Sequence, residues 1–290
     1  MLQRGQRREE CACVVRNAFD SVFFSQHRLP LQQVCSGKYI HGVKWLKKPT
    51  DLVDNIFSRR CARCFALCAT LWACLCSTPS EAKEVFGFES VSQLAKKAAD
   101  EAFRAPPSIP DFLKTISYDE YRDIRFDVKE SLWKDRGNFQ LQLIHPGFVF
   151  GNAVRLNTIE EGTVKRINFS PNLFTYGRNK FADKIPSDLG FAGFRIAYPF
   201  NQREEFNHAL VFAGASYFRA VAKGEVFGLT GRGLAIDTGL PSGEEFPLFT
   251  EFWLERPAPA ARQMKLYGLL DSASVTGAYA FTVAREIPRF

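Results

Sequence analysis

The residue types best suited to chemistry gather between residues 207 and 257, where acidic, basic and aromatic side chains are interleaved. Sugar hydroxyls need hydrogen-bond partners, and the C–H face of a sugar ring packs on a flat apolar surface. A stretch that sets carboxylates beside aromatic rings therefore suits carbohydrate binding. The residues that we predict to contact sugar are Asp237, Glu244 and Trp253, supported by Tyr217 and Arg232. For each of them, core packing or a buried ion pair that fixes a turn is the alternative.

Glycoside hydrolysis would need two carboxyl groups at a defined separation. Within this stretch the candidates are Asp237, Glu244, Glu245 and Glu251. Glu244 and Glu245 are adjacent, so in an extended chain they point to opposite sides and at most one of them lines a cleft. The sequence therefore assigns no catalytic pair, and the question of enzymatic activity stays open.

Motifs for other kinds of chemistry are incomplete. Ser216 lacks the closing glycine of a nucleophile elbow, and the glycines of 228–233 are in the wrong order for a dinucleotide-binding loop. Only two histidines, His145 and His208, follow residue 82, where cysteine is absent, and the pair in Cys61-Ala-Arg-Cys64 has no second pair of ligands. We therefore expect neither a metal ion nor a cofactor.

The hydrophobic pattern predicts the elements that position these residues. Ser90 begins a capping box, and apolar residues then recur at helical spacing to residue 102, ahead of Pro106 and Pro107. One amphipathic helix is expected there. From Tyr118 onward the pattern favours short strands separated by turns. The clearest strands are 139–143, 163–169 and 191–198, and the clearest turns are 135–138 and 160–163.

Strands at short intervals with hardly any helix are typical of an all-β fold. We predict a large antiparallel β-sandwich with one N-terminal helix. Five glycines between residues 224 and 239 indicate tight turns in the stretch that carries the candidate site.

Charge and cysteine content divide the chain near residue 82. The formal net charge is +7, but the first 82 residues hold 12 of the 38 basic and 6 of the 31 acidic residues, which leaves 26 basic against 25 acidic residues in the remainder. Because the excess of basic residues lies in the first 82 residues, we expect no nucleic-acid partner. All eight cysteines precede residue 77, which suits export of the remainder to an oxidising compartment without disulfides.

Residues 58–82 have the three-part layout of a secretory signal peptide. Arg59, Arg60 and Arg63 form a positive cluster, the 13 residues 64–76 carry no charge, and small residues follow at Ser80 and Ala82. Because about 20 apolar residues are needed to span a bilayer, we expect no stable membrane span in the mature form.

Residues 1–57 mix Arg and Cys without a sustained period. We predict that they are a spurious or unstructured extension and that translation begins nearer Leu52 or Val53. Residues 83–290 are then the N-terminal part of one β-sandwich domain.

Several segments closely resemble the periplasmic glucans biosynthesis protein G/D family (OpgG/MdoG). The longest is Gly233-Leu-Ala-Ile-Asp-Thr-Gly-Leu-Pro-Ser-Gly-Glu-Glu-Phe-Pro, which is flanked by 212–220 and 249–257. The likeness continues at 121–126, 190–196 and 269–279, so it covers roughly residues 86 to 283.

This resemblance implies a sandwich of the galactose-mutarotase-like supersandwich kind, followed in full-length members by a smaller immunoglobulin-like domain. It implies a periplasmic protein that acts on or binds the β-1,2-glucan backbone of osmoregulated periplasmic glucans, with a membrane glucan glucosyltransferase as functional partner. Members with hydrolytic activity cleave β-1,2-glucan, and the resemblance places their catalytic carboxylates beyond Phe290. We therefore expect this chain to supply part of the cleft wall and to be inactive by itself.

Members of the family are also longer than this chain. We expect a frameshift or a fragmentary gene, with the immunoglobulin-like domain absent and the 83–290 product prone to aggregation or degradation because sheet edges would be uncovered. Two alternatives to the biosynthetic role stay open: a carbohydrate-binding or scaffolding module without catalysis, and a truncated gene product without function.

Overall fold

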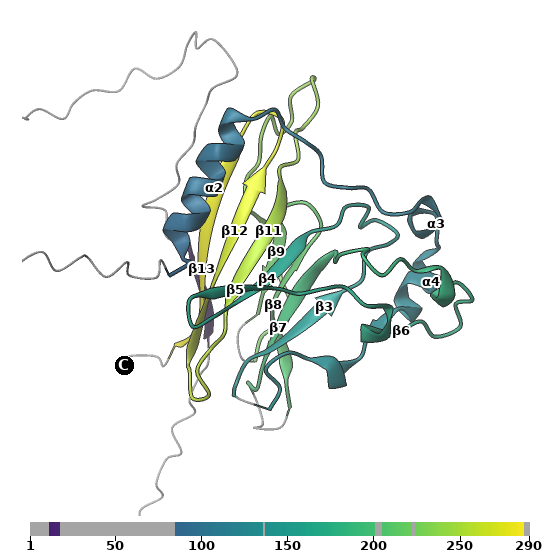
Figure 1. Ribbon diagram of the computed structural model, residues 1–290, viewed down its shortest axis with the longest axis vertical. Helices are drawn as coiled ribbons and strands as arrows, with labels where there is room; N and C mark the ends of the chain where they lie inside the picture. Colours follow the sequence, from purple (N-terminus) through teal and green to yellow (C-terminus); the bar gives the residue numbers. More distant parts are fainter. Residues whose placement is uncertain (1–11, 18–84, 136, 201–204, 222–223, 287–290) are drawn as a thin grey trace, which may run out of the picture. The chain divides into compact units, whose positions relative to one another are not determined.

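Two β-sheets make up most of the structure (Figure 1). The computed structural model describes residues 12–17, 85–135, 137–200, 205–221 and 224–286. The chain divides into two units, and all of these residues belong to one of them; the other, residues 29–84, lies outside the described part.

The larger sheet has the strand order β1-β13-β12-β11-β4-β5. Its strands are β1 (Ala12–Asn17), β4 (Arg155–Glu160), β5 (Thr163–Arg166), β11 (Leu248–Glu255), β12 (Gln263–Asp271) and β13 (Thr276–Glu286). Neighbouring strands are antiparallel except β4 and β11, which run parallel. A parallel pair needs a crossover connection, and the connection between β4 and β11 contains β5 and most of the second sheet.

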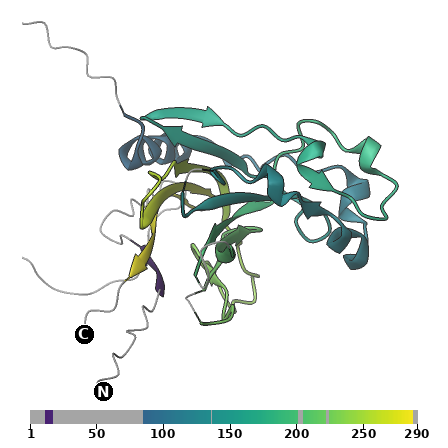
Figure 2. The same cartoon turned by 90° about the horizontal axis from the view of Figure 1, so that it is seen from below.

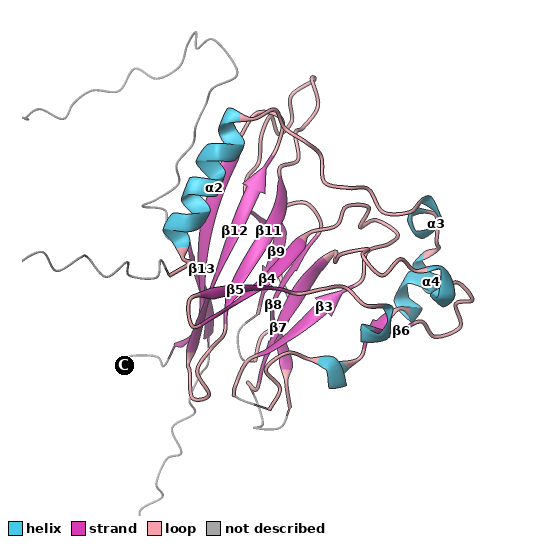
Figure 3. Cartoon of the chain, viewed as in Figure 1, coloured by secondary structure: helices cyan, strands magenta, loops and turns pink. Residues whose placement is uncertain are grey.

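The smaller sheet has the order β10-β9-β8-β7-β3 and is antiparallel throughout. Its strands are β3 (Gln140–Ile144), β7 (Gly193–Tyr198), β8 (Asn207–Ala213), β9 (Tyr217–Ala220) and β10 (Gly231–Arg232). In Figure 3 these strands and those of the larger sheet account for most of the regular structure. A separate two-stranded sheet joins β2 (Arg125–Phe126) and β6 (Phe174–Thr175).

The main core lies between the two sheets and is rich in phenylalanine. Phe212 on β8 has five ring neighbours at centroid distances of 4.9 to 5.8 Å, from both sheets. These neighbours are Phe194, Phe218, Phe249, Phe252 and Phe281. Each such pair adds about 0.5–1.5 kcal/mol beyond the burial of its area, so the cluster fixes how the two sheets pack.

Helix α2 (Phe88–Asp100) covers the opposite face of the larger sheet, along β12 and β13 (Figures 1 and 2). Val91 and Ala95 are buried in a second apolar cluster with Trp253 and Tyr267 from the sheet. The remaining helices are short: α3 (Asp111–Lys114), α4 (Tyr118–Asp123) and the 3-10 turns η2 (Val128–Glu130), η3 (Pro171–Leu173) and η4 (Ala182–Lys184).

The all-β sandwich predicted from the sequence is confirmed, with one helix longer than six residues among the described ones. The predicted segment 139–143 overlaps β3 in all but its last residue, 163–169 and 191–198 contain β5 and β7, and the turn at 160–163 contains two left-handed residues, Glu161 and Gly162. The larger sheet differs from the prediction because it is mixed rather than purely antiparallel.

Helix boundaries were predicted less well. Helix α2 begins at Phe88, two residues before the expected cap, and Ser90 instead accepts a hydrogen bond from the Gly87 N–H through Oγ at 3.2 Å. Residues 118–123, expected to begin the strand region, form α4 because Ser117 and Glu120 make a reciprocal capping box.

The predicted signal peptide, residues 58–82, lies outside the described residues. Within 1–57, the described stretch is strand β1, which pairs antiparallel with β13. No helix among the described residues combines the length and apolar character that crossing a membrane requires.

Candidate functional site

The outer face of the smaller sheet, away from the main core, carries a row of polar and charged side chains. Phe194, Phe212 and Phe218 occupy opposed positions on β7, β8 and β9 and point into the core. One position further along each strand, side chains alternate to the other face. Arg195 is paired there with Gln142 on β3 and Val211 on β8.

The same row ends at Arg219 on β9, which is opposite Val211. Residues directly opposite each other on neighbouring strands share a face. Arg195 and Arg219 are therefore two strand spacings apart on one face, about 10 Å between their Cα atoms.

Two adjoining hollows lie over this row, and we call them together the Arg195 groove. Their volumes are about 470 Å³ and about 410 Å³, within the range of about 300–1,000 Å³ typical of ligand sites. Both are lined by Tyr121, Ile144 and Arg195. The first also has Phe150, Val211, Ala213, Tyr217, Phe218, Arg219 and Thr230, and the second includes Arg122, Arg125, Gln142 and His208.

Helix α4 places Tyr121 over the groove. The Tyr121 hydroxyl donates a hydrogen bond to the His145 carbonyl oxygen at 2.8 Å, and its ring packs against Phe148 and Phe150 at 6.3 and 5.7 Å. Burial raises the pKa of Tyr121 well above its ordinary value, against the opposing effect of the Arg195 charge. Tyr121 is therefore a neutral, fixed aromatic surface.

Arg195 is the central charge of the groove. Burial lowers its pKa from the ordinary value, and the nearby Tyr121 hydroxyl opposes that effect, but a guanidinium stays protonated in proteins. Among the residues that the structure describes, no carboxylate pairs with it. Burial, and then the charge of Arg195, lower the pKa of His208, which donates from Nε2 to Gln142 Oε1 at 3.1 Å.

Three of the five side chains predicted to contact sugar lie next to one another, and one of the three lines the groove. Tyr217 lines the groove and is the cross-strand partner of Arg232 on β10. Arg232 forms an ion pair with Glu244 and donates to Thr238 Oγ1 at 3.3 Å. Asp237 belongs to the same segment, is exposed, and has a left-handed backbone with φ of 57°. Its carbonyl accepts from the Leu240 N–H, so it forms part of a turn.

Trp253 lies on the other sheet. Its side chain is 3% exposed beneath helix α2, with its ring 5.4 Å from that of Phe86. In this arrangement the ring has almost no surface to offer a sugar, so we do not include it in the groove.

The other acidic candidates are engaged in ion pairs or hydrogen bonds. The Ser274 backbone N–H and the Ser274 hydroxyl donate hydrogen bonds to the Glu245 carboxylate, at 3.0 and 2.8 Å. The neighbouring Glu244 pairs with Arg232. The two adjacent carboxylates therefore have different partners. Glu251 bridges Arg155 and Asn157 on β4, at 2.8 Å to each.

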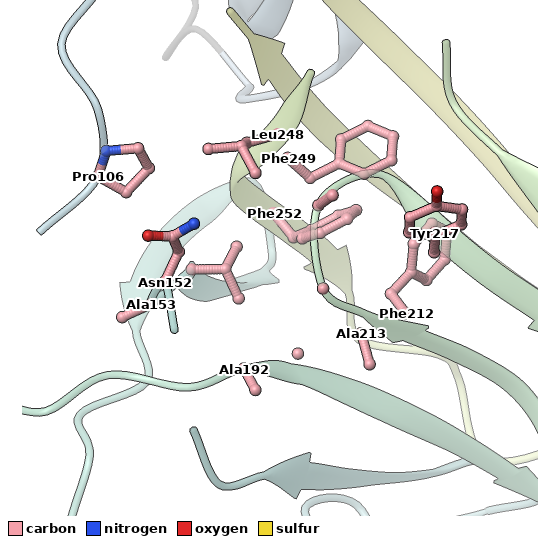
Figure 4. A pocket seen from close by; sticks show the side chains of 14 residues that line it. Pro106, Asn152, Ala153, Ala192, Phe212, Ala213, Tyr217, Leu248, Phe249 and Phe252 are labelled. Carbon is pink, nitrogen blue, oxygen red and sulfur yellow. The ribbon is translucent and has the colours of Figure 1, made fainter. Parts of the chain in front are cut away.

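A smaller hollow adjoins the groove beyond Ala213 and Tyr217 (Figure 4). Phe212, Phe249 and Phe252 form much of its wall. With a volume of about 20 Å³, it has room for about one water molecule. A sugar ring does not fit there.

No group of three or more His, Cys, Asp or Glu side chains suited to a metal ion occurs within the described residues. The groove offers aromatic rings, amides, hydroxyls and guanidinium groups, which can bind a polar ligand by stacking and hydrogen bonding.

Sequence reasoning found Tyr217 but missed Arg195, Tyr121 and Arg219. The available signal was the single charged residue inside 191–198, a run otherwise apolar. A charge in the middle of a buried strand needs a partner or a role, and that argument would have selected Arg195.

Comparisons with known proteins agree with the residues of the resemblance. Residues 86–288 match a family model described as "Periplasmic glucan biosynthesis protein, MdoG". A protein called Glucans biosynthesis protein G from Ralstonia nicotianae is 45% identical over 206 residues, which are 70% of this chain and 41% of that protein. One of the same name from Rhodopseudomonas palustris is 47% identical over 195 residues, 67% of this chain and 39% of that protein. This chain therefore spans about two fifths of the length of these curated relatives.

Proposed function

This chain belongs to the MdoG family of periplasmic glucan biosynthesis proteins, and from that premise we propose that it takes part in glucan biosynthesis in the periplasm by binding the β-1,2-linked glucan backbone in the Arg195 groove. The observation that carries the proposal is the combination of aromatic and hydrogen-bonding side chains on one open sheet face. The relatives bear the name of a biosynthesis protein, and contact with the growing chain accounts for such a role.

Three rings supply the apolar surfaces. The rings of Tyr121 and Phe150 pack against each other, and Tyr217 on β9 lines the same hollow. Sugar rings stack their C–H faces on such surfaces, while Gln142, Arg195 and Thr230 offer hydrogen bonds to hydroxyl groups. Two adjoining hollows suit a chain of linked sugars better than a single small molecule.

Binding is favoured over hydrolysis for this part of the family fold. Hydrolysis of a glycosidic bond needs two carboxyl groups flanking it, and neither hollow is lined by Asp or Glu among the described residues. Glu244, the partner of Arg232 beside Tyr217, is held in an ion pair. We therefore propose that the chain holds the glucan and positions it, and that a membrane glucan glucosyltransferase which extends the chain is its functional partner.

Isothermal titration calorimetry of the full chain with linear β-1,2-glucan oligosaccharides tests this proposal. Tyr217→Ala removes one stacking surface and should weaken binding about tenfold, or about 1.4 kcal/mol. The matched control is Phe246→Ala, because Phe246 is 51% exposed and lies outside the groove; its affinity should equal that of the unaltered chain.

Absence of heat and of any other binding signal with β-1,2-glucan would refute the proposal. Equal weakening by Tyr217→Ala and Phe246→Ala would place the binding elsewhere. Equal affinity for an α-linked glucan of the same length would contradict recognition of the β-1,2 linkage.

A further inference from the structure

The Arg195 groove is unbalanced in charge. Four arginines line it, namely Arg122, Arg125, Arg195 and Arg219, whereas no aspartate or glutamate lines it among the described residues. Arginine side chains donate hydrogen bonds and accept none. A neutral sugar hydroxyl both donates and accepts, so a groove built mainly from arginine donors suits it poorly at the points where those arginines lie.

Arg195 contributes most to this imbalance. It is half-buried in a strand between core residues, and no described carboxylate lies within ion-pair distance of it. Burying a charge without a partner is costly. Gln142 Oε1, a neighbouring acceptor on the same row, already accepts a hydrogen bond from His208. The guanidinium therefore lacks an anionic acceptor in the described structure.

Arg219 faces the same space from two strands away. Its Nε donates to Thr230 Oγ1 at 2.7 Å, which fixes the guanidinium beside the first hollow. On the other side, Arg125 and Arg122 line the second hollow, and Arg122 also pairs with Asp119 at 3.2 Å on the surface. Positive charge thus extends over both hollows, with Arg195 where they join.

We propose that the ligand of the Arg195 groove is a glucan that carries an anionic group, either a phosphate ester or a carboxylate, which binds between Arg195 and Arg219 while the sugar rings stack on Tyr121 and Tyr217. This inference rests on the proposed function and specifies its substrate class. An oxyanion accepts several hydrogen bonds at once, and bonds from arginine to phosphate or carboxylate are about twice as strong as those between neutral groups.

The alternative class of anionic ligand with flat rings is single-stranded nucleic acid, which also binds to arginines and aromatic rings. The family membership favours a saccharide. The nucleic acid is therefore an arm of the test.

Calorimetry of the full chain at low salt should compare linear β-1,2-glucan in three forms: unsubstituted, phosphorylated and carboxymethylated. At least one of the two anionic forms should bind about tenfold more tightly than the neutral form, and the difference should shrink in 0.5 M salt because screening weakens charge pairing. A difference confined to one of the two forms identifies the anionic group that the groove takes.

Two substitutions locate the effect. Arg195→Gln should abolish the preference for anionic glucan, and Arg219→Gln, at an exposed position, should reduce that preference without affecting folding. Arg262→Gln is the matched control because it removes the same charge at an exposed position outside the groove; the preference should persist.

A second readout does not depend on Arg195 being replaceable. Burial, and then the charge of Arg195, lower the pKa of His208. An anion beside Arg195 would offset the second of these effects, so the imidazole NMR signal of His208 should titrate at higher pH with phosphorylated glucan bound than with neutral glucan bound.

Equal affinity for neutral and anionic glucans would overturn this inference and leave the proposed function intact. Binding of neither would refute the proposed function itself. Single-stranded DNA or inorganic phosphate binding as tightly as the anionic glucans would overturn the assignment to a saccharide.

Discussion

Mild acid should destabilise this fold through His145, which follows directly after β3. Its side chain is 3% exposed and is enclosed edge-on by Phe169, Phe174 and Tyr176 at centroid distances of 5.0 to 5.6 Å. Nδ1 donates to the Pro146 carbonyl and Nε2 accepts from the Tyr176 hydroxyl at 3.3 Å, an arrangement that suits the neutral ring. Burial lowers the pKa of His145 from 6.5 to about 4, against the opposing effect of the hydrogen bond to Pro146.

The sign and size of the effect follow from this pKa. Between pH 6.5 and about 4 the unfolded chain takes up a proton that the folded chain does not, so the free energy of unfolding falls as the pH drops through this window. Below about pH 4 both states carry the proton, and His145 makes no further change to the free energy of unfolding. At about 1.4 kcal/mol for each pKa unit, the full loss is about 3 kcal/mol. About 2 kcal/mol of it falls between pH 7 and pH 5.

Urea unfolding at pH 7, 6 and 5 measures this loss in the unaltered chain and in His145→Gln. The variant should lose about 2 kcal/mol less between pH 7 and pH 5, whatever its stability at pH 7. His208→Gln is the comparison variant: burial also lowers the pKa of His208, so this variant loses the His208 contribution and keeps that of His145. A pH dependence that is the same in His145→Gln and in the unaltered chain would refute the assignment of a buried neutral imidazole.

Three further predictions concern packing and charge. Phe212→Ala should lower the free energy of unfolding by about 4 kcal/mol, measured in urea, because the ring joins both sheets. Gly193→Ala should cost about 3 kcal/mol or prevent folding, since its Cβ would lie 1.9 Å from the Phe212 carbonyl oxygen; Gly228→Ala, in open space, should unfold as the unaltered chain does. Glu251→Gln should cost about 1 kcal/mol in low salt and less in 1 M salt, measured in the same assay, because it weakens the ion pair with Arg155 on the neighbouring strand.

The elements with strong local patterns were predictable. The alternation in 139–143 identifies β3, and the glycine of 160–163 identifies the turn between β4 and β5, where Gly162 has a φ of 74°. Helix α2 follows from its apolar spacing. Each of these depends on residues close together in the chain, so the sequence contains the information.

The pairing of the strands was harder to predict from the sequence. The parallel contact of β4 with β11 joins Arg155 to Glu251 across 96 positions, and no local pattern specifies it. Helix α4 was missed because its six residues, which follow the capping box of Ser117 with Glu120, are too few to show an apolar helical period.

The candidate site was predictable in part for the same reason. Tyr217 and Trp253 have similar surroundings in sequence, yet strand register turns Tyr217 to the groove and Trp253 beneath helix α2. Arg195 stands out when its strand is assigned to the centre of a sheet, because only then is its charge inside a buried strand.

Methyl NMR of the full chain, titrated with linear β-1,2-glucan, is the most direct test of the central claim that this groove binds the glucan. The methyl groups of Ile144, Val211 and Ala213 line the first hollow, and the account predicts that their signals shift, while the signal of Leu229, 98% exposed and outside the groove, does not. Saturating glucan that leaves all three groove signals unchanged, or that shifts Leu229 instead, would contradict the account.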